Sequence, residues 1–136
     1  MGSGGLILLD THVLIWWKAG GGKLSQRAAR AVHASDTVLL SAISFWEIAV
    51  LERKSRIRLD RDLLRWIGDV LSEDRVREAP VSAQAGAHAG ALPDFGGDPA
   101  DAILYCTARE LGAPLVTKDR RLTAYARAHR DVRTVW

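Results

Sequence analysis

The fold is decided by the stretch Leu6-Ile7-Leu8-Leu9-Asp10, in which four apolar residues are followed by an acid. A continuous apolar run of this length, without alternation, is typical of a strand that is buried on both faces. Residues 37–41 have the same character and predict a second buried strand. Because such strands need helices on both sides of their sheet, the two stretches predict an α/β domain with a parallel sheet.

The rest of the chain alternates between strand and helix patterns. Further strands are predicted at 76–81, 114–117 and 132–136. Helix starts are predicted near Val13, after Ser25, at Ser44 with Glu47 as a capping box, after Asp60, after Ser82, at Asp98-Pro99 and near Arg120. This order predicts a single domain over residues 6–136, a three-layer α/β/α sandwich with a four- or five-stranded parallel sheet. Residues 1–5 are expected to be a flexible N-terminal segment.

Composition narrows the functional classes. The chain has 136 residues, of which 48% are hydrophobic and 26% charged, which is enough apolar material for one core. Cys106 is the only cysteine, so a disulfide within the chain and a cysteine-based zinc site are excluded. The net charge of +3 and the pI of about 9.4 are compatible with a polyanionic partner but do not establish one. No leader or membrane-spanning stretch is evident, so we expect a cytoplasmic protein.

Four acids stand where predicted strands end or helices begin: Asp10, Glu47, Asp101 and Asp119. Each of them alone is better explained as a helix cap or as a first-turn acid that favours the helix dipole. Taken together they suggest more, because the carboxyl ends of neighbouring parallel strands meet at one edge of a sheet. The sequence therefore predicts that the four side chains share one cleft.

Carboxylates gathered in one cleft point to a metal ion. They repel one another and resist ionising together unless a cation compensates them. Ligands that are all oxygen suit a hard ion, Mg²⁺ or Mn²⁺. Such an ion activates water and stabilises charge on a phosphoryl oxygen, so the pattern favours a phosphodiesterase without choosing between RNA and DNA.

The acids lie in four ordered motifs that resemble those of PIN domains, most closely the VapC-type toxins of bacterial toxin–antitoxin pairs. The motifs are Leu8-Leu9-Asp10-Thr11-His12, Ser41-Ala42-Ile43-Ser44-Phe45-Trp46-Glu47-Ile48, Gly97-Asp98-Pro99-Ala100-Asp101 and Pro114-Leu115-Val116-Thr117-Lys118-Asp119. The resemblance covers about residues 6 to 136. It implies Mg²⁺- or Mn²⁺-dependent endonucleolytic cleavage of RNA, usually tRNA or rRNA, by in-line attack of water that leaves a 5′-phosphate and a 3′-hydroxyl.

The resemblance also implies roles for single residues. Asp10, Glu47 and Asp101 match the core metal-binding acids, and Asp119 matches a fourth, more variable acid. Beside them, Thr117 matches a common hydroxyl residue of the site, while Asp98 is a lesser candidate that we interpret as a helix cap. Three further residues neighbour the cleft and are possible RNA contacts: Lys118, Arg120 and His12.

The family also predicts partners, an antitoxin protein whose helix is buried beside the site and a second copy of the chain in a homodimer. Two positions depart from close relatives, which often have His where Gly96 stands and Arg where Ala102 stands. The missing arginine is expected to affect substrate binding more than metal binding.

Two other functions compete with this interpretation. A phosphatase of the haloacid-dehalogenase type would need a second Asp two residues after Asp10, where His12 stands. A degenerate PIN domain would bind RNA or protein without catalysis. The presence of all four acids argues against a non-catalytic domain, whereas the alanine at position 102 is consistent with one.

Overall fold

The computed structural model describes residues 5–136, and the predicted N-terminal segment, apart from Gly5, lies outside the described residues. Five parallel strands form one sheet in the order β3-β2-β1-β4-β5. The strands are β1 (Leu6–Leu9), β2 (Thr37–Ser41), β3 (Val76–Ala79), β4 (Leu115–Val116) and β5 (Thr134–Val135). The predicted parallel sheet is confirmed, with five strands rather than four.

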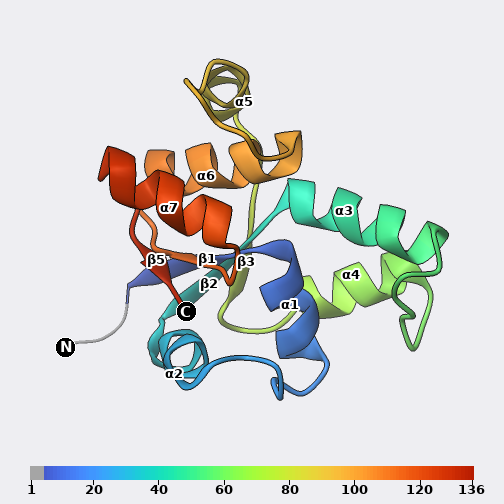
Figure 1. The fold of residues 1–136 in the computed structure, drawn as a ribbon. Coiled ribbons are helices and arrows are strands. Elements are labelled where there is room, and N and C mark those ends of the chain that lie inside the picture. The colour runs from blue at the N-terminus through green and yellow to red at the C-terminus, as the bar shows by residue number, and fades with distance from the viewer. Residues whose placement is uncertain (1–4) are drawn as a thin grey trace.

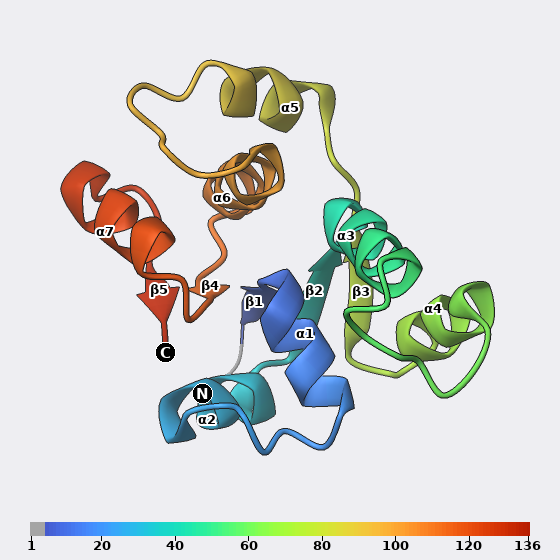
Figure 2. The same cartoon turned by 45° about the vertical axis from the view of Figure 1, so that its right-hand side comes forward.

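Seven helices connect and cover these strands in the described part of the chain. They are α1 (Thr11–Lys18), α2 (Gln26–Ala34), α3 (Ala42–Arg53), α4 (Leu63–Leu71), α5 (Ala83–Gly90), α6 (Pro99–Leu111) and α7 (Arg120–His129). Figures 1 and 2 show α5, α6 and α7 on one side of the sheet and α1, α2 and α4 on the other. The α/β/α sandwich is therefore confirmed.

The central strand β1 shows why helices cover both faces. Leu9 packs with α1 and α4 side chains in one core cluster, whereas its neighbour Leu8 packs with α6 and α7 side chains in the other. Both leucines are fully buried. Since successive side chains of a strand point to opposite faces, an unbroken apolar run is what two separate cores require.

Two predicted helix starts are wrong. The helix predicted to begin at Ser44 begins at Ala42, because Ser41 ends β2 in extended geometry and its hydroxyl caps the backbone N–H of Ile43. Ser44 is instead buried inside α3.

The helix predicted after Asp60 begins later, because Asp62 is its cap and accepts from the N–H of Arg65. The Asp60 carboxylate pairs with Arg61 instead. The caps Ser25, Ser82 and Asp98 are confirmed. The short strand predicted within 76–81 is confirmed at Val76–Ala79, and those predicted at 114–117 and 132–136 are confirmed at Leu115–Val116 and Thr134–Val135.

Candidate metal centre

The four predicted acids line one cavity of about 390 Å³ at the carboxyl edge of the sheet. Asp10 follows β1, and Glu47 lies on α3, which starts directly after β2. Asp101 lies in the first turn of α6, and Asp119 caps α7 just beyond β4. The predicted adjacency of the first, second and fourth strands is what brings these separate stretches together.

Asp10 is the most firmly held of the four. It is only 8% exposed, and both of its carboxylate oxygens accept hydrogen bonds. Oδ1 accepts from the backbone N–H of Thr11 at 2.6 Å, and Oδ2 accepts from the Thr117 hydroxyl at 2.6 Å. Burial raises the pKa of Asp10, and the Thr117 hydrogen bond opposes that rise. The side chain is therefore fixed in orientation, and within residues 5–136 it forms no ion pair.

Glu47 is held by a hydroxyl that the sequence interpretation did not assign. The Thr11 hydroxyl donates to Oε1 of Glu47 at 2.5 Å, and it lies 2.9 Å from the hydroxyl of Ser44. Thr11 and Ser44 are both buried. Burial raises the pKa of Glu47, and repulsion from Asp98 and Asp10 adds to the rise. The Asp-Thr pair at the strand end was the available sequence signal for this contact.

Asp101 has the most perturbed carboxyl group in the cavity. Burial raises its pKa to about 7, and repulsion from Asp98, Asp10, Asp119 and Glu47 contributes in that order. Such a shift means that the ionised cluster is unfavourable without added positive charge. The shared cavity thus has the electrostatic character that a divalent cation relieves.

Asp98 and Asp119 serve both as caps and as cavity residues. Oδ1 of Asp98 accepts from the N–H of Asp101 at 2.8 Å, so the predicted cap is confirmed while its side chain also lines the cavity. Oδ1 of Asp119 accepts from the N–H groups of Arg121 and Leu122. These caps place the N-terminal ends of α6 and α7 at the cavity, where the helix dipoles favour negative charge.

The donor set fits a hard cation in its chemistry. All the acids offer oxygen ligands, which is the preference of Mg²⁺ and Mn²⁺. Within residues 5–136, however, no three acidic, histidine or cysteine side chains are already gathered in a metal-binding arrangement. Asp10 and Glu47 are turned toward the hydroxyls of Thr117 and Thr11. The cavity therefore has the right ligand chemistry, but its carboxylates are not gathered around one point in this structure.

The possible RNA contacts differ in position. His12 and Lys118 line the cavity, and both are exposed. Arg120 is exposed but is not among the lining residues. Val13 and Trp16 also line the cavity, although the sequence interpretation assigned them no part in it.

The two positions that depart from close relatives lie outside the lining of the acidic cavity. The Ala102 side chain is buried and lines a separate cavity between α5 and α6, together with Ile103. It does not line the acidic cavity. Gly96 lies in the loop before α6, and its carbonyl accepts from Arg121 at 2.5 Å.

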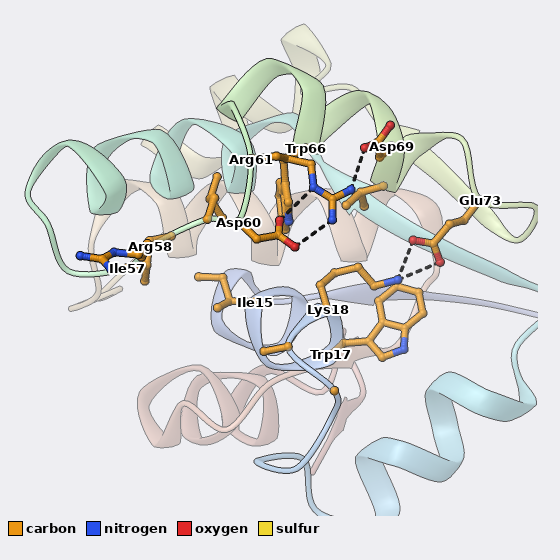
Figure 3. Close-up of a pocket in the computed structure, with 14 residues that line it drawn as sticks. Ile15, Trp17, Lys18, Ile57, Arg58, Asp60, Arg61, Trp66, Asp69 and Glu73 are labelled. Atoms are coloured by element: carbon orange, nitrogen blue, oxygen red, sulfur yellow. Dashed lines mark hydrogen bonds and ion pairs between the residues drawn. The ribbon is translucent and has the colours of Figure 1, made fainter.

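A second cavity, of about 510 Å³, lies between the end of α1 and α4 (Figure 3). Each of its three carboxylates is already paired with a cation. Arg61 binds Asp60 and Asp69, and Lys18 binds Glu73 at 2.6 Å. This cavity therefore has no cluster of uncompensated carboxylates to hold a metal ion.

Comparison with known proteins agrees with this architecture. The model of the PIN domain family matches residues 7–128. Ribonuclease VapC22 of Mycobacterium tuberculosis is 43% identical to the chain over 133 residues, which cover 96% of the chain and 98% of the relative.

Solved structures share the fold at low sequence identity. VapBC-1 from nontypeable Haemophilus influenzae has a TM-score of 0.65 at 18% identity and covers 96% of both chains. A toxin–antitoxin complex from Klebsiella pneumoniae has a TM-score of 0.60 at 23% identity and covers 83% of this chain and 86% of its own. The helices of residues 5–136 include none that is long and apolar enough to cross a bilayer. With the family model matching most of its length, the chain belongs to the PIN domain family, and within it to the VapC-type proteins.

Proposed function

We propose that the chain is a Mg²⁺- or Mn²⁺-dependent endoribonuclease that acts as the toxin of a toxin–antitoxin pair. One observation carries the proposal: carboxylates from four distant stretches line a single cavity, where burial and repulsion from the neighbouring acids raise the pKa of Asp101 to about 7. Membership of the PIN domain family and the 43% identity to a protein named Ribonuclease VapC22 support it.

The four acids have different roles in binding the ion. Asp10 and Asp101 are the main ligands, and Glu47 either binds the ion or orients the attacking water. Asp119 supports a second ion or an outer-shell water. When bound there, the ion supplies Lewis-acid activation of water and neutralises charge on the phosphate.

The chain's other residues prepare these ligands. Thr117 and the backbone N–H of Thr11 fix both oxygens of Asp10, so its orientation is set before any ligand arrives. The Thr11 hydroxyl does the same for Glu47. Because burial and neighbouring acids raise the pKa of Glu47, its carboxylate is a stronger proton acceptor than an exposed one. Such a group is suited to take a proton from the attacking water.

Substrate and partners follow from the family. We propose tRNA or rRNA as substrate, a cognate antitoxin as inhibitor, a homodimer as the assembly and the cytoplasm as the location. The similar solved structures include VapBC-1 and a toxin–antitoxin complex, and these descriptions support the antitoxin. All four matched acids line one cavity, which supports catalysis over a binding module.

The test is cleavage of total RNA by the wild-type chain in Mg²⁺, Mn²⁺ or EDTA, beside Asp10→Asn and the control Asp74→Asn. Asp74 is exposed and does not line the acidic cavity. We expect cleavage in either metal by the wild type and Asp74→Asn, and none in EDTA or by Asp10→Asn. Cleavage that survives both EDTA and Asp10→Asn would contradict the proposed chemistry. Inertness of every protein on many RNAs would favour the non-catalytic binding module.

A further inference from the structure

One wall of the acidic cavity is aromatic. His12 and Trp16 are four residues apart on α1, so they lie on the same face of that helix, and both line the cavity. Their ring centroids are 5.8 Å apart, and the Trp16 ring is also 5.8 Å from that of Trp136, which directly follows β5. Both tryptophans are only partly buried and His12 is exposed. His12 and Trp16 line the cavity beside the acids, and Trp136 lies behind Trp16, packed against the core.

A single cation accompanies these rings. The Lys118 ammonium lies 5.8 Å from the Trp16 ring centroid and 5.9 Å from that of Trp136. Lys118 is the only lysine or arginine among the residues that line the cavity in the described chain. Within residues 5–136 it forms no ion pair. We call His12, Trp16, Trp136 and Lys118 the aromatic shelf.

The charges at the cavity limit how RNA can be held there. Proteins that grip a nucleic acid through its phosphates use several lysines or arginines. Here five acids and one lysine line the cavity, so the phosphates close to it find little attraction from the chain itself. Bases carry no charge, and every base has a face that stacks on an aromatic side chain. The bases of RNA are not repelled by the acids, and the aromatic shelf is a surface on which they can stack.

We propose that the aromatic shelf binds an unpaired nucleobase of the RNA next to the scissile phosphate, with Lys118 contacting that nucleotide's phosphate. This inference rests on the proposed function and names the residues of this chain that hold a substrate base. A base inside a duplex keeps its faces stacked on neighbouring bases, whereas one in a loop or bulge is free to stack on protein. Trp16, Trp136 and His12 are thus substrate-positioning residues that act apart from the acids.

The experiment compares two probes of about ten nucleotides each, an oligoadenylate and an abasic oligomer with the same number of phosphates. Fluorescence anisotropy measures their binding with Ca²⁺ in place of Mg²⁺, and gel electrophoresis verifies that the probe stays intact. We expect the wild type to bind the oligoadenylate on the order of 10- to 100-fold more tightly than the abasic oligomer. A fully paired RNA of the same length should bind about as weakly as the abasic oligomer.

Variants locate the effect. Trp16→Leu and Trp136→Leu should each remove most of the preference for the oligoadenylate, whereas Trp136→Phe should retain much of it because a stacking face remains. Trp46→Leu is the matched control, since Trp46 is 59% exposed but does not line the cavity. Thermal melting verifies that each variant is folded, and the wild-type comparison of the two probes needs no variant at all.

The outcomes separate the aromatic shelf from the nuclease. Equal binding of the two probes by the wild type would overturn the aromatic shelf. So would an unchanged preference in both leucine variants, or an equal loss in Trp46→Leu. Base-dependent binding that disappears in the leucine variants supports the aromatic shelf even if Mg²⁺ produces no cleavage, in which case only the proposed function fails. Cleavage by a wild type without base preference would leave the nuclease standing and the aromatic shelf refuted.

Discussion

Replacing Asp101 by asparagine should stabilise the metal-free protein and abolish most of its stabilisation by metal. Asparagine keeps the size of the side chain and removes the negative charge that burial and Asp98, Asp10, Asp119 and Glu47 disfavour. The cap of α6 is unaffected, because the backbone N–H of Asp101 donates to the Asp98 carboxylate and the Asp101 side chain takes no part. The change therefore acts on the charge of the cavity.

The magnitude follows from the pKa of Asp101, which is 3.8 for an isolated aspartate and about 7 in the folded chain. At about 1.36 kcal/mol for each pKa unit, the limit is about 4 kcal/mol. Because Asp101 is only partly buried, solvent screening reduces this to about 1–2 kcal/mol. Loss of a negative charge in the first turn of α6 opposes it by about 0.3–1 kcal/mol. The net gain of about 1 kcal/mol corresponds to about 3–5 °C in Tm for a chain of this size.

The sign depends on pH. Below about pH 4 the carboxyl is protonated in both the folded and the unfolded chain, so Asp101 costs nothing. Between about pH 4 and 7 the unfolded chain loses its proton first, and wild-type stability falls as pH rises. Above about pH 7 Asp101 is ionised in the folded chain as well, and the wild type carries the full destabilisation from this partly buried charge. Asp101→Asn should therefore gain at about pH 8 and gain little near pH 4.

The assay is thermal melting of the wild type, Asp101→Asn and the exposed control Asp74→Asn, in EDTA and in excess Mg²⁺. In EDTA at about pH 8, Asp101→Asn should melt above the wild type. In Mg²⁺ at about 100 times the dissociation constant, the wild type should gain about 2.7 kcal/mol and Asp101→Asn much less. The reasoning is refuted if Asp101→Asn melts below the wild type in EDTA, or if Mg²⁺ stabilises both equally.

Four further outcomes are expected. Thr117→Val removes the hydroxyl that donates to Asp10 and should lower Mg²⁺ affinity about 10- to 100-fold by calorimetry, and an unchanged affinity would show that this hydroxyl does not matter. Mg²⁺ affinity measured by calorimetry should decline as pH falls through about 7, where metal-free Asp101 takes up a proton, and an affinity that is flat from about pH 6 to 8 would argue against Asp101 as a ligand. Ile48→Ala leaves a cavity at a fully buried site and should cost about 2–5 kcal/mol in denaturant unfolding, so a loss below about 1 kcal/mol would contradict the described core. Gly112 ends α6 at φ 63°, and Gly112→Ala should cost about 1 kcal/mol by the same measurement, whereas no cost would mean that the helix end adapts.

Much of the fold was predictable because its signals are local and strong. The apolar runs at 6–9 and 37–41 are long enough to indicate strands buried on both faces, and the structure confirms both. The helix starts at 44 and 60 were predicted wrongly because local signals were ambiguous there. Each region offers two cap residues a few positions apart, Ser41 or Ser44 and Asp60 or Asp62, and tertiary contacts decide between them. Ser44 packs beside Thr11, a contact that no local pattern reveals.

The acids of the cavity were predictable because each follows a strand or opens a helix. The parts that sequence reasoning missed depend on contacts between distant stretches. Thr11 is held against Glu47 across 36 positions, and Trp16 meets Trp136 only because β5 lies at the edge beside β4. Such pairs have no fixed spacing in the sequence, so no periodicity indicates them.

The central claim is that the four carboxylates share a divalent ion, and crystals grown with Mn²⁺ test it most directly through the anomalous signal of the metal. We predict an ion in the acidic cavity with carboxylate oxygens of Asp10 and Asp101 at about 2.1 Å, and its loss in Asp10→Asn crystals under the same conditions. A cavity that stays free of Mn²⁺ at saturating concentration, or an ion bound only away from these acids, would contradict the account.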